Sequence, residues 1–192
     1  MATTESPACI VVCDAGPLIH LDEIDALDLL ADFPRVLVPD AVWREVQRHR
    51  PTALANPSLV IERLEPVSPA PPELQTLSQV LSLHSGEWQA LRLVLEHPPA
   101  LLLTNDTAAR LAATNFGITA HGTIGILIRA IRRKLRSKQQ VLSLLRSIPS
   151  ASTLHLKRSL LAAVIREVEN NPKSSQSKIR VTETPLFSRL AS

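Results

Sequence analysis

Two short apolar runs, each leading into an aspartate, constrain the fold of this chain more than any other feature. The run at residues 9–13 precedes Asp14, and the run that begins at Leu101 leads to Asp106. Nearly continuous apolar runs of this length are typical of strands that are buried on both faces, as in a parallel sheet covered by helices. The two runs therefore predict a mainly parallel sheet in which each aspartate follows the carboxyl end of a buried strand.

Segments of strand and helix character alternate along the chain. Strands are predicted at residues 9–13, 35–38, 59–64, 101–106 and 118–120. Helical periodicity predicts helices at 18–30, 85–96, 107–114, 123–134, 138–147 and 153–169. Another helix is predicted to begin after Asp40 as its N-cap. Glycine and proline indicate a turn at 14–17, and the proline-rich residues 66–72 are interpreted as a surface spacer. This order predicts an α/β fold in which helices cover both faces of the sheet.

Length and composition favour one globular domain. The chain has 192 residues, 45% of them hydrophobic and 20% charged, which suits a single hydrophobic core. We expect a domain over residues 1–169 and a polar, serine-rich linker and tail over residues 170–192. No apolar run reaches the roughly 18 residues that span a bilayer, and the N-terminus lacks the basic start of a signal peptide. No membrane association is expected.

The two cysteines suggest a reducing compartment. Cys9 and Cys13 lie four positions apart in a predicted strand, too far from each other in extended chain to form a disulfide. Without a second pair of ligands they do not form a zinc motif either. We interpret both as small buried strand residues of a cytoplasmic protein.

Charge is distributed unevenly along the chain, although the net charge is only +3. Residues 107–166 contain no Asp or Glu, whereas Lys and Arg are frequent there. This asymmetry favours a polyanionic partner such as RNA, although a solvated helix surface would give the same pattern. The candidate RNA-binding residues are Arg110, Arg129, Arg132, Arg133, Lys134 and Arg136.

Carboxylates at the loop edge of the predicted sheet form the candidate site. Asp14 and Asp106 reach this edge by their position after strands, Glu87 lies in the first turn of a predicted helix, and Glu45 would have to reach over from the side. Each acid alone has a structural explanation as a turn former, cap or surface residue. No glycine-rich phosphate loop follows a strand, and the histidines lack metal-ligand spacing, so the chain offers no competing site.

Five segments together resemble PIN-domain proteins, most closely a prokaryotic branch related to the VapC type of toxin. The similarity covers roughly residues 10–169, and each piece is weak alone but specific as part of the ordered set. These segments are residues 11–19, 38–46, 85–91, 102–110 and 122–125.

The resemblance implies a PIN-like three-layer α/β/α sandwich and a metal-dependent ribonuclease. It places the four family acids on Asp14, Glu45, Glu87 and Asp106, which would hold Mg²⁺ or Mn²⁺ and hydrolyse RNA. It also implies a toxin-like protein with a small antitoxin partner and a homodimeric state. Hard divalent cations prefer such oxygen ligands, and a bound ion lowers the pKa of water for attack on a phosphodiester. Thr104, Asn105 and Thr123 are expected to support the site.

Two departures from the family pattern keep other interpretations open. The third acid is a glutamate where aspartate is frequent, and Asn105 stands where the closest branch often has another aspartate. A PIN-fold RNA-binding or scaffold protein with weak or no catalysis is therefore the main alternative. A phosphatase of the haloacid-dehalogenase kind is disfavoured, because it needs an aspartate two residues after Asp14 and finds Gly16.

Overall fold

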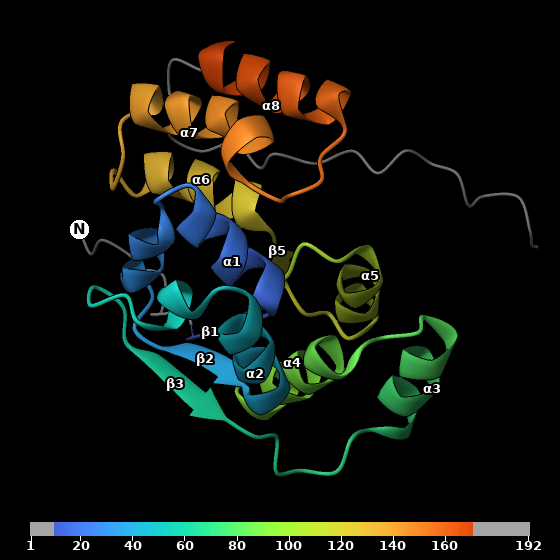
Figure 1. The fold of residues 1–192 in the computed structure, drawn as a ribbon. Coiled ribbons are helices and arrows are strands. Elements are labelled where there is room, and N and C mark those ends of the chain that lie inside the picture. The colour runs from blue at the N-terminus through green and yellow to red at the C-terminus, as the bar shows by residue number, and fades with distance from the viewer. Residues whose placement is uncertain (1–9, 171–192) are drawn as a thin grey trace, which may run out of the picture.

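The computed structural model describes residues 10–170, which form a five-stranded, fully parallel sheet with helices on both faces (Figure 1). The spatial order of the strands is β3-β2-β1-β4-β5. From β1, the chain first adds β2 and β3 on one side of the sheet and then β4 and β5 on the other side. The direction in which strands are added therefore reverses between β1 and β4. This fold confirms the α/β class and the parallel sheet predicted from the sequence. The strands are β1 (Ile10–Cys13), β2 (Val36–Pro39), β3 (Ile61–Leu64), β4 (Ala100–Leu103) and β5 (Ala120–His121).

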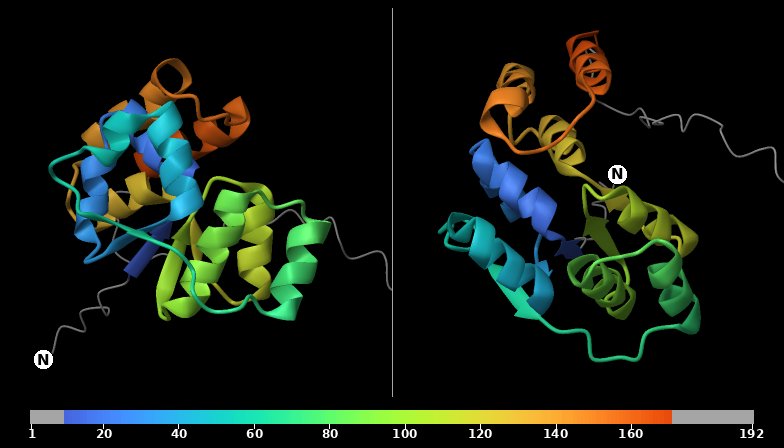
Figure 2. Two further views of the ribbon diagram at one scale, coloured as in Figure 1. Left: turned by 60° about the horizontal axis from the view of Figure 1, so that its bottom comes forward. Right: turned by 45° about the vertical axis from the view of Figure 1, so that its right-hand side comes forward.

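Two helical layers cover the sheet (Figure 2). One face carries α1 (Ala15–Glu23), α2 (Asp40–His49) and α6 (Thr123–Arg132), with the short 3₁₀ helices η1 (Leu27–Asp32) and η2 (Pro51–Leu54). The other face carries α3 (Pro72–Val80), α4 (Ser85–Glu96) and α5 (Thr107–Asn115). Beyond α6 lie α7 (Lys138–Ala151) and α8 (Arg158–Asn170), with α8 packed on α7 (Figure 1).

The alternation of side chains along β1 divides the core in two. Val11 and Cys13 pack into the cluster under α1, α2 and α6, whereas Val12 packs into the cluster under α4 and α5. All three side chains are fully buried, as expected of a central strand with helices on both faces. Cys13 is a buried core residue, as predicted, and this burial raises the pKa of its thiol. Cys9 lies outside the described residues.

Two local predictions at helix starts were wrong. Residues 14–17 do not form a turn, because α1 begins at Ala15, directly after β1. Pro17 is tolerated there, since a backbone N–H in the first helical turn has no intrahelical acceptor. Asp40 is not the N-cap of α2, because Pro39 holds that position and the Asp40 carboxylate instead pairs with Arg63 and Arg44.

Several boundaries also differ from the sequence prediction. The proline-rich spacer ends in a helix that was not predicted, α3, which begins at Pro72 and buries Leu74. The last predicted helix begins later, at Arg158, because residues 152–157 form an irregular connection after α7. Within residues 10–170, no helix combines the length and apolar character needed to cross a membrane. The predicted tail after Asn170 lies outside the described residues.

Candidate carboxylate site

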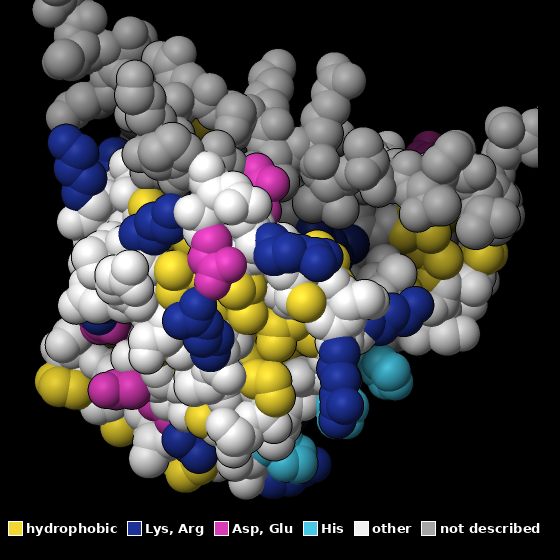
Figure 3. Space-filling view, turned by 90° about the horizontal axis from the view of Figure 1, so that it is seen from above, with side chains coloured by type: hydrophobic (Ala, Val, Ile, Leu, Met, Phe, Trp, Pro, Cys, Tyr) yellow, Lys and Arg dark blue, Asp and Glu magenta, His cyan; other side chains and the backbone are white. Residues whose placement is uncertain are grey.

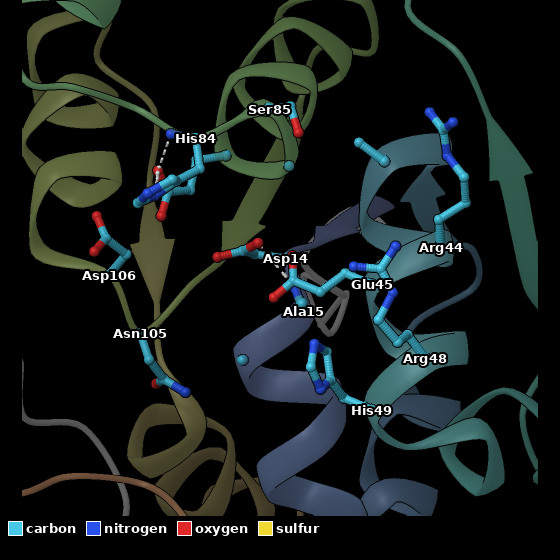
Figure 4. Close-up of a pocket in the computed structure, with 14 residues that line it drawn as sticks. Asp14, Ala15, Arg44, Glu45, Arg48, His49, His84, Ser85, Asn105 and Asp106 are labelled. Atoms are coloured by element: carbon cyan, nitrogen blue, oxygen red, sulfur yellow. Dashed lines mark hydrogen bonds and ion pairs between the residues drawn. The ribbon is translucent and has the colours of Figure 1, made fainter.

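All four predicted acids line one pocket of about 840 Å³ at the carboxyl edge of the sheet (Figure 4). Asp14 follows β1, and Asp106 follows β4 after two further residues. Glu45 comes from α2 and Glu87 from the first turn of α4. Because the strand order reverses between β1 and β4, this edge is where open parallel sheets form ligand sites. The fold thus brings together residues from four separate segments of the chain.

Asp14 is the most constrained of the four carboxylates. Its side chain is 8% exposed and accepts hydrogen bonds of 2.8 Å from the backbone N–H of Ala15 and from Thr104 Oγ1. Burial raises the pKa of Asp14 to about 6, and the negative charges of Glu87 and Glu45 add to this rise against the two hydrogen bonds. A carboxylate in this setting is stabilised by any cation that enters the pocket.

Asp14 and Glu45 approach each other beside Gly86. A Cβ atom placed on Gly86 would lie 3.6 Å from Glu45 Oε2 and 3.8 Å from Asp14 Oδ1, and 3.2 Å from Val42 Cγ2. The glycine therefore leaves room between the two carboxylates, both of which border it. In Figure 4 the Glu45 side chain points from α2 toward Asp14, while Asp106 lies across the pocket.

Glu87 and Asp106 are held by helix N-termini. Glu87 Oε2 accepts a 2.7 Å hydrogen bond from the backbone N–H of His84, which precedes α4. Asp106 Oδ1 accepts a 2.8 Å bond from Ala109 N and is the N-cap of α5, as its structural interpretation anticipated. Both carboxylates are fixed at the pocket wall by these contacts.

The donor set fits a hydrated divalent cation. Within residues 10–170, no group of three or more His, Cys, Asp or Glu side chains is close enough to surround a metal ion directly. Mg²⁺ usually retains several waters and takes only one or two protein carboxylates, so it does not require such a group. The carboxyl oxygens and the raised pKa of Asp14 suit a hard cation in this pocket.

The predicted supporting residues join β4 to α6 around the site. The Thr104 hydroxyl is buried, donates to Asp14 and accepts a 3.1 Å bond from Asp106 N. Asn105 Nδ2 donates to Thr123 Oγ1, and Thr123 N donates back to Asn105 Oδ1, both at 2.9 Å. The Asn105 amide is thus committed to the start of α6, although Asn105 also lines the pocket.

The predicted basic residues lie away from this pocket. Arg129 and Arg133 pair with Asp32 of η1, and Arg136 pairs with Asp28. Figure 3 shows Lys and Arg side chains at the end of the molecule formed by α7 and α8, dispersed among acidic and apolar ones.

The other three members of the predicted set are exposed. Arg132 and Lys134 lie at the end of α6, and Arg110 lies on α5. A Cβ atom on Gly122 would lie 3.3 Å from Arg110 Nη1 and 2.5 Å from Asn105 Oδ1, so Arg110 reaches the loop beside Asn105. Of the predicted basic residues, Arg110 therefore comes nearest to the site.

Sequence reasoning missed the basic residues that do line the pocket. Arg44, Arg48 and His49 come from α2, and His84 precedes α4. The signal was present, because Arg48 and His49 follow Glu45 by three and four positions, and Arg44 precedes Arg48 by four, which are spacings of about one helical turn. The two tryptophans beside the acids, Trp43 and Trp88, each pack against one of the two core clusters.

A fully parallel sheet between two helical layers, with carboxylates gathered at its carboxyl edge, defines a nuclease-type α/β/α sandwich. The chain belongs to the PIN-domain family, since the family model DUF3368, a PIN domain, matches residues 10–170. PIN domains are generally nucleases and typically use divalent metal ions. A comparison with curated proteins gives no match.

Proposed function

We propose that this protein is a metal-dependent endoribonuclease that hydrolyses RNA phosphodiester bonds in the carboxylate pocket. The observation that carries the proposal is the buried Asp14 carboxylate, which has a raised pKa and shares one pocket with Glu45, Glu87 and Asp106. The negative charges of these carboxylates repel one another, and a bound divalent cation would reduce this repulsion. Mg²⁺ and Mn²⁺ both suit carboxylate and water ligands.

The residues of this chain hold and orient the proposed site. Asp14 is fixed by Ala15 N and Thr104, and Glu45 reaches it from α2 beside Gly86. Glu87 and Asp106 keep their positions through bonds to helix N-termini. When bound, the ion lowers the pKa of a coordinated water and offsets charge on the phosphate.

Phosphate contacts are the proposed basis of RNA binding. Aromatic residues make up only 3% of the chain, which leaves little surface on which bases could stack. Of the predicted basic set, the exposed residues Arg110, Arg132 and Lys134 remain the proposed contacts of flanking RNA. Arg129, Arg133 and Arg136 are engaged by Asp32 and Asp28, which weakens the case for them.

The resemblance to VapC-type toxins extends the proposal to a biological role. We propose a toxin-like ribonuclease that forms a homodimer and is neutralised by a small antitoxin protein in the cytoplasm. Induced expression with growth and RNA integrity as readouts tests this role. Arrest by the wild-type chain but not by Asp106→Asn supports toxicity, and equal growth of both strains contradicts it.

A second candidate function is RNA binding without catalysis. It is favoured by the Asn105 amide, which is engaged at the start of α6 by its hydrogen bonds with Thr123. A protein of this kind would bind RNA equally well in EDTA and in Mn²⁺, and would leave it intact.

Cleavage of a labelled single-stranded RNA in Mg²⁺, Mn²⁺ or EDTA separates the two functions. The nuclease proposal predicts cleavage that requires the metal and is lost in Asp14→Asn. Asp25→Asn is the matched control, because it makes the same chemical change at an exposed position with a positive φ of 54°, which asparagine tolerates. Metal-independent cleavage, or cleavage retained in Asp14→Asn, contradicts the proposal.

A further inference from the structure

The wall of the pocket formed by α2 carries positive charge next to the carboxylates. We propose that Arg48 binds a phosphate group of single-stranded RNA beside the carboxylate site. This inference rests on the proposed function for its substrate class. It adds a contact inside the pocket itself to the exposed basic residues that are proposed to bind flanking RNA.

The position of this wall is fixed by the packing of α2. Val42 and Val46 are fully buried in the core and hold one face of the helix against the sheet. The backbone N–H of Ala41, in the first turn, donates a 2.9 Å hydrogen bond to Gln89 Oε1 of α4. The neighbouring face of the helix lines the pocket and consists of Ala41, Arg44, Glu45, Arg48 and His49.

The two arginines of this face differ in their partners. Arg44 Nη2 lies 2.8 Å from Asp40 Oδ2, and Figure 4 shows its side chain pointing away from Asp14. Arg48 is exposed and, among residues 10–170, forms no ion pair or hydrogen bond. Glu45 lies one turn before it, but no ion pair within 4.0 Å joins the two side chains. Arg48 therefore has its guanidinium donors available to a ligand.

Charge balance in the pocket calls for such a contact. Four carboxylates line the pocket, and without cations they would repel a polynucleotide. A divalent ion offsets part of this charge at the reacting phosphate, while a neighbouring phosphate needs a separate partner. The planar guanidinium group donates two parallel hydrogen bonds to a phosphate, which an ammonium group cannot do.

The alternative is that Arg48 is a solvated surface cation whose charge serves no ligand. Binding of a fluorescent single-stranded RNA, measured by anisotropy over a range of salt concentrations, tests between the two. Measurements in EDTA and in Ca²⁺ are compared, and a gel verifies that the probe is intact. Arg146→Gln on α7 is the matched control, because Arg146 is a half-exposed arginine that pairs with Glu169 away from the pocket.

Arg48→Gln is expected to weaken RNA binding about tenfold, which corresponds to roughly 1.4 kcal/mol, because it removes a charged hydrogen-bond donor to phosphate. The slope of log Kd against log salt should fall by about 0.7, the value for one lost contact to a single strand. Arg48→Lys should keep the salt slope but recover only part of the affinity. In cleavage assays, Arg48→Gln should raise KM more than it lowers kcat.

The outcomes separate this inference from the proposed function. Weaker RNA binding by Arg48→Gln supports the phosphate contact. If the wild-type protein at the same time shows no metal-dependent cleavage, the nuclease proposal is contradicted and the phosphate contact is not. If the wild-type protein cleaves RNA in a metal-dependent way but Arg48→Gln has an unchanged Kd and salt slope, the phosphate contact is overturned and the nuclease proposal stands. A wild-type protein that binds no single-stranded RNA, or an equal loss in Arg146→Gln, also overturns the contact.

Discussion

The Thr104 hydroxyl donates a 2.8 Å hydrogen bond to Asp14 Oδ2, joining residues that are 90 positions apart in the chain. The contact follows from the register of neighbouring parallel strands, in which Cys13 of β1 lies opposite Leu103 of β4. The residues that follow this pair, Asp14 and Thr104, are therefore adjacent at the carboxyl edge of the sheet. This contact links the fold to the candidate chemistry, because it orients the central carboxylate of the pocket.

Thr104→Val should disturb the electrostatics of the pocket. The substitution keeps the side-chain volume but leaves Asp14 Oδ2 without its hydroxyl donor, so the pKa of Asp14 should rise above about 6. We expect a loss of about 1–3 kcal/mol of unfolding free energy in urea titrations of the metal-free protein. Thr104→Ser restores the hydroxyl and should restore the pKa, which carboxyl-detected NMR measures. An unchanged pKa in the valine variant would argue against this hydrogen bond.

The metal-free protein should lose stability as pH rises through the range in which Asp14 ionises. The pKa of Asp14 is about 6 in the folded chain against 3.8 for an ordinary aspartate, so between these values the folded state binds more protons. Its contribution is favourable at low pH and is lost as pH rises through about 6. At pH 7.5, Asp14→Asn should therefore be more stable than the wild type, by on the order of 2 kcal/mol.

Urea unfolding in EDTA from pH 4 to pH 8 measures this effect. The difference between the wild type and Asp14→Asn should grow across the range, whereas Asp25→Asn should follow the wild type throughout. A difference that does not vary with pH would mean that Asp14 ionises normally in the folded chain.

Glu23 should stabilise the connection between α7 and α8. Burial acts to raise the pKa of Glu23, but hydrogen bonds from Ser152, Thr153 and His20 outweigh it and lower the pKa to about 2. The stabilisation is present above the ordinary value of 4.5 and is lost as pH falls toward about 2. At pH 7, Glu23→Gln should lose about 1 kcal/mol, allowing for solvent screening.

Hydrogen exchange checks the location of this effect. Amides of residues 152–157 should exchange faster in Glu23→Gln, while those of β1 and β4 should not change. Below pH 3, the stability of the variant should approach that of the wild type. If amide exchange in Glu23→Gln became faster by the same factor over the whole chain, Glu23 would not act locally on residues 152–157.

Gly122→Ala should break the connection between Asn105 and α6. The backbone conformation at Gly122 is open to any residue, but a Cβ there would lie 2.5 Å from Asn105 Oδ1. The asparagine must move and lose its bond from Thr123 N, which should cost about 1–3 kcal/mol. The double variant with Asn105→Ala removes the clashing atom, so the two costs should be less than additive. Additive losses in urea unfolding would show that the clash does not occur.

The fold and part of the site were accessible from local sequence signals. Asp14 and Asp106 could be predicted because each follows an apolar strand, and parallel strands end at one edge. Glu45 carries no such signal, since its place in the pocket depends on how α2 packs through Val42 and Val46. The resemblance to a family supplied what the local pattern lacked at that position.

The charge pattern along the chain does not show which of the basic residues are paired in the fold. Arg129 and Arg133 appear unpaired in the sequence because their partner, Asp32, lies about a hundred positions earlier, at separations of 97 and 101 residues. Only the packing of α6 beside η1 brings them together. Arg48 was overlooked because it lies in a segment of mixed charge, where no excess of positive charge marks it.

Calorimetric titration of the metal-free protein with Mn²⁺ tests the central claim most directly. The account predicts binding by the wild type and by the control Asp25→Asn, and a strong loss of affinity in Asp14→Asn and Glu45→Gln. Circular dichroism should show that both site variants remain folded. Mn²⁺ binding of equal strength in all four proteins, or none in the wild type, would contradict the assignment of this pocket as a metal-dependent nuclease site.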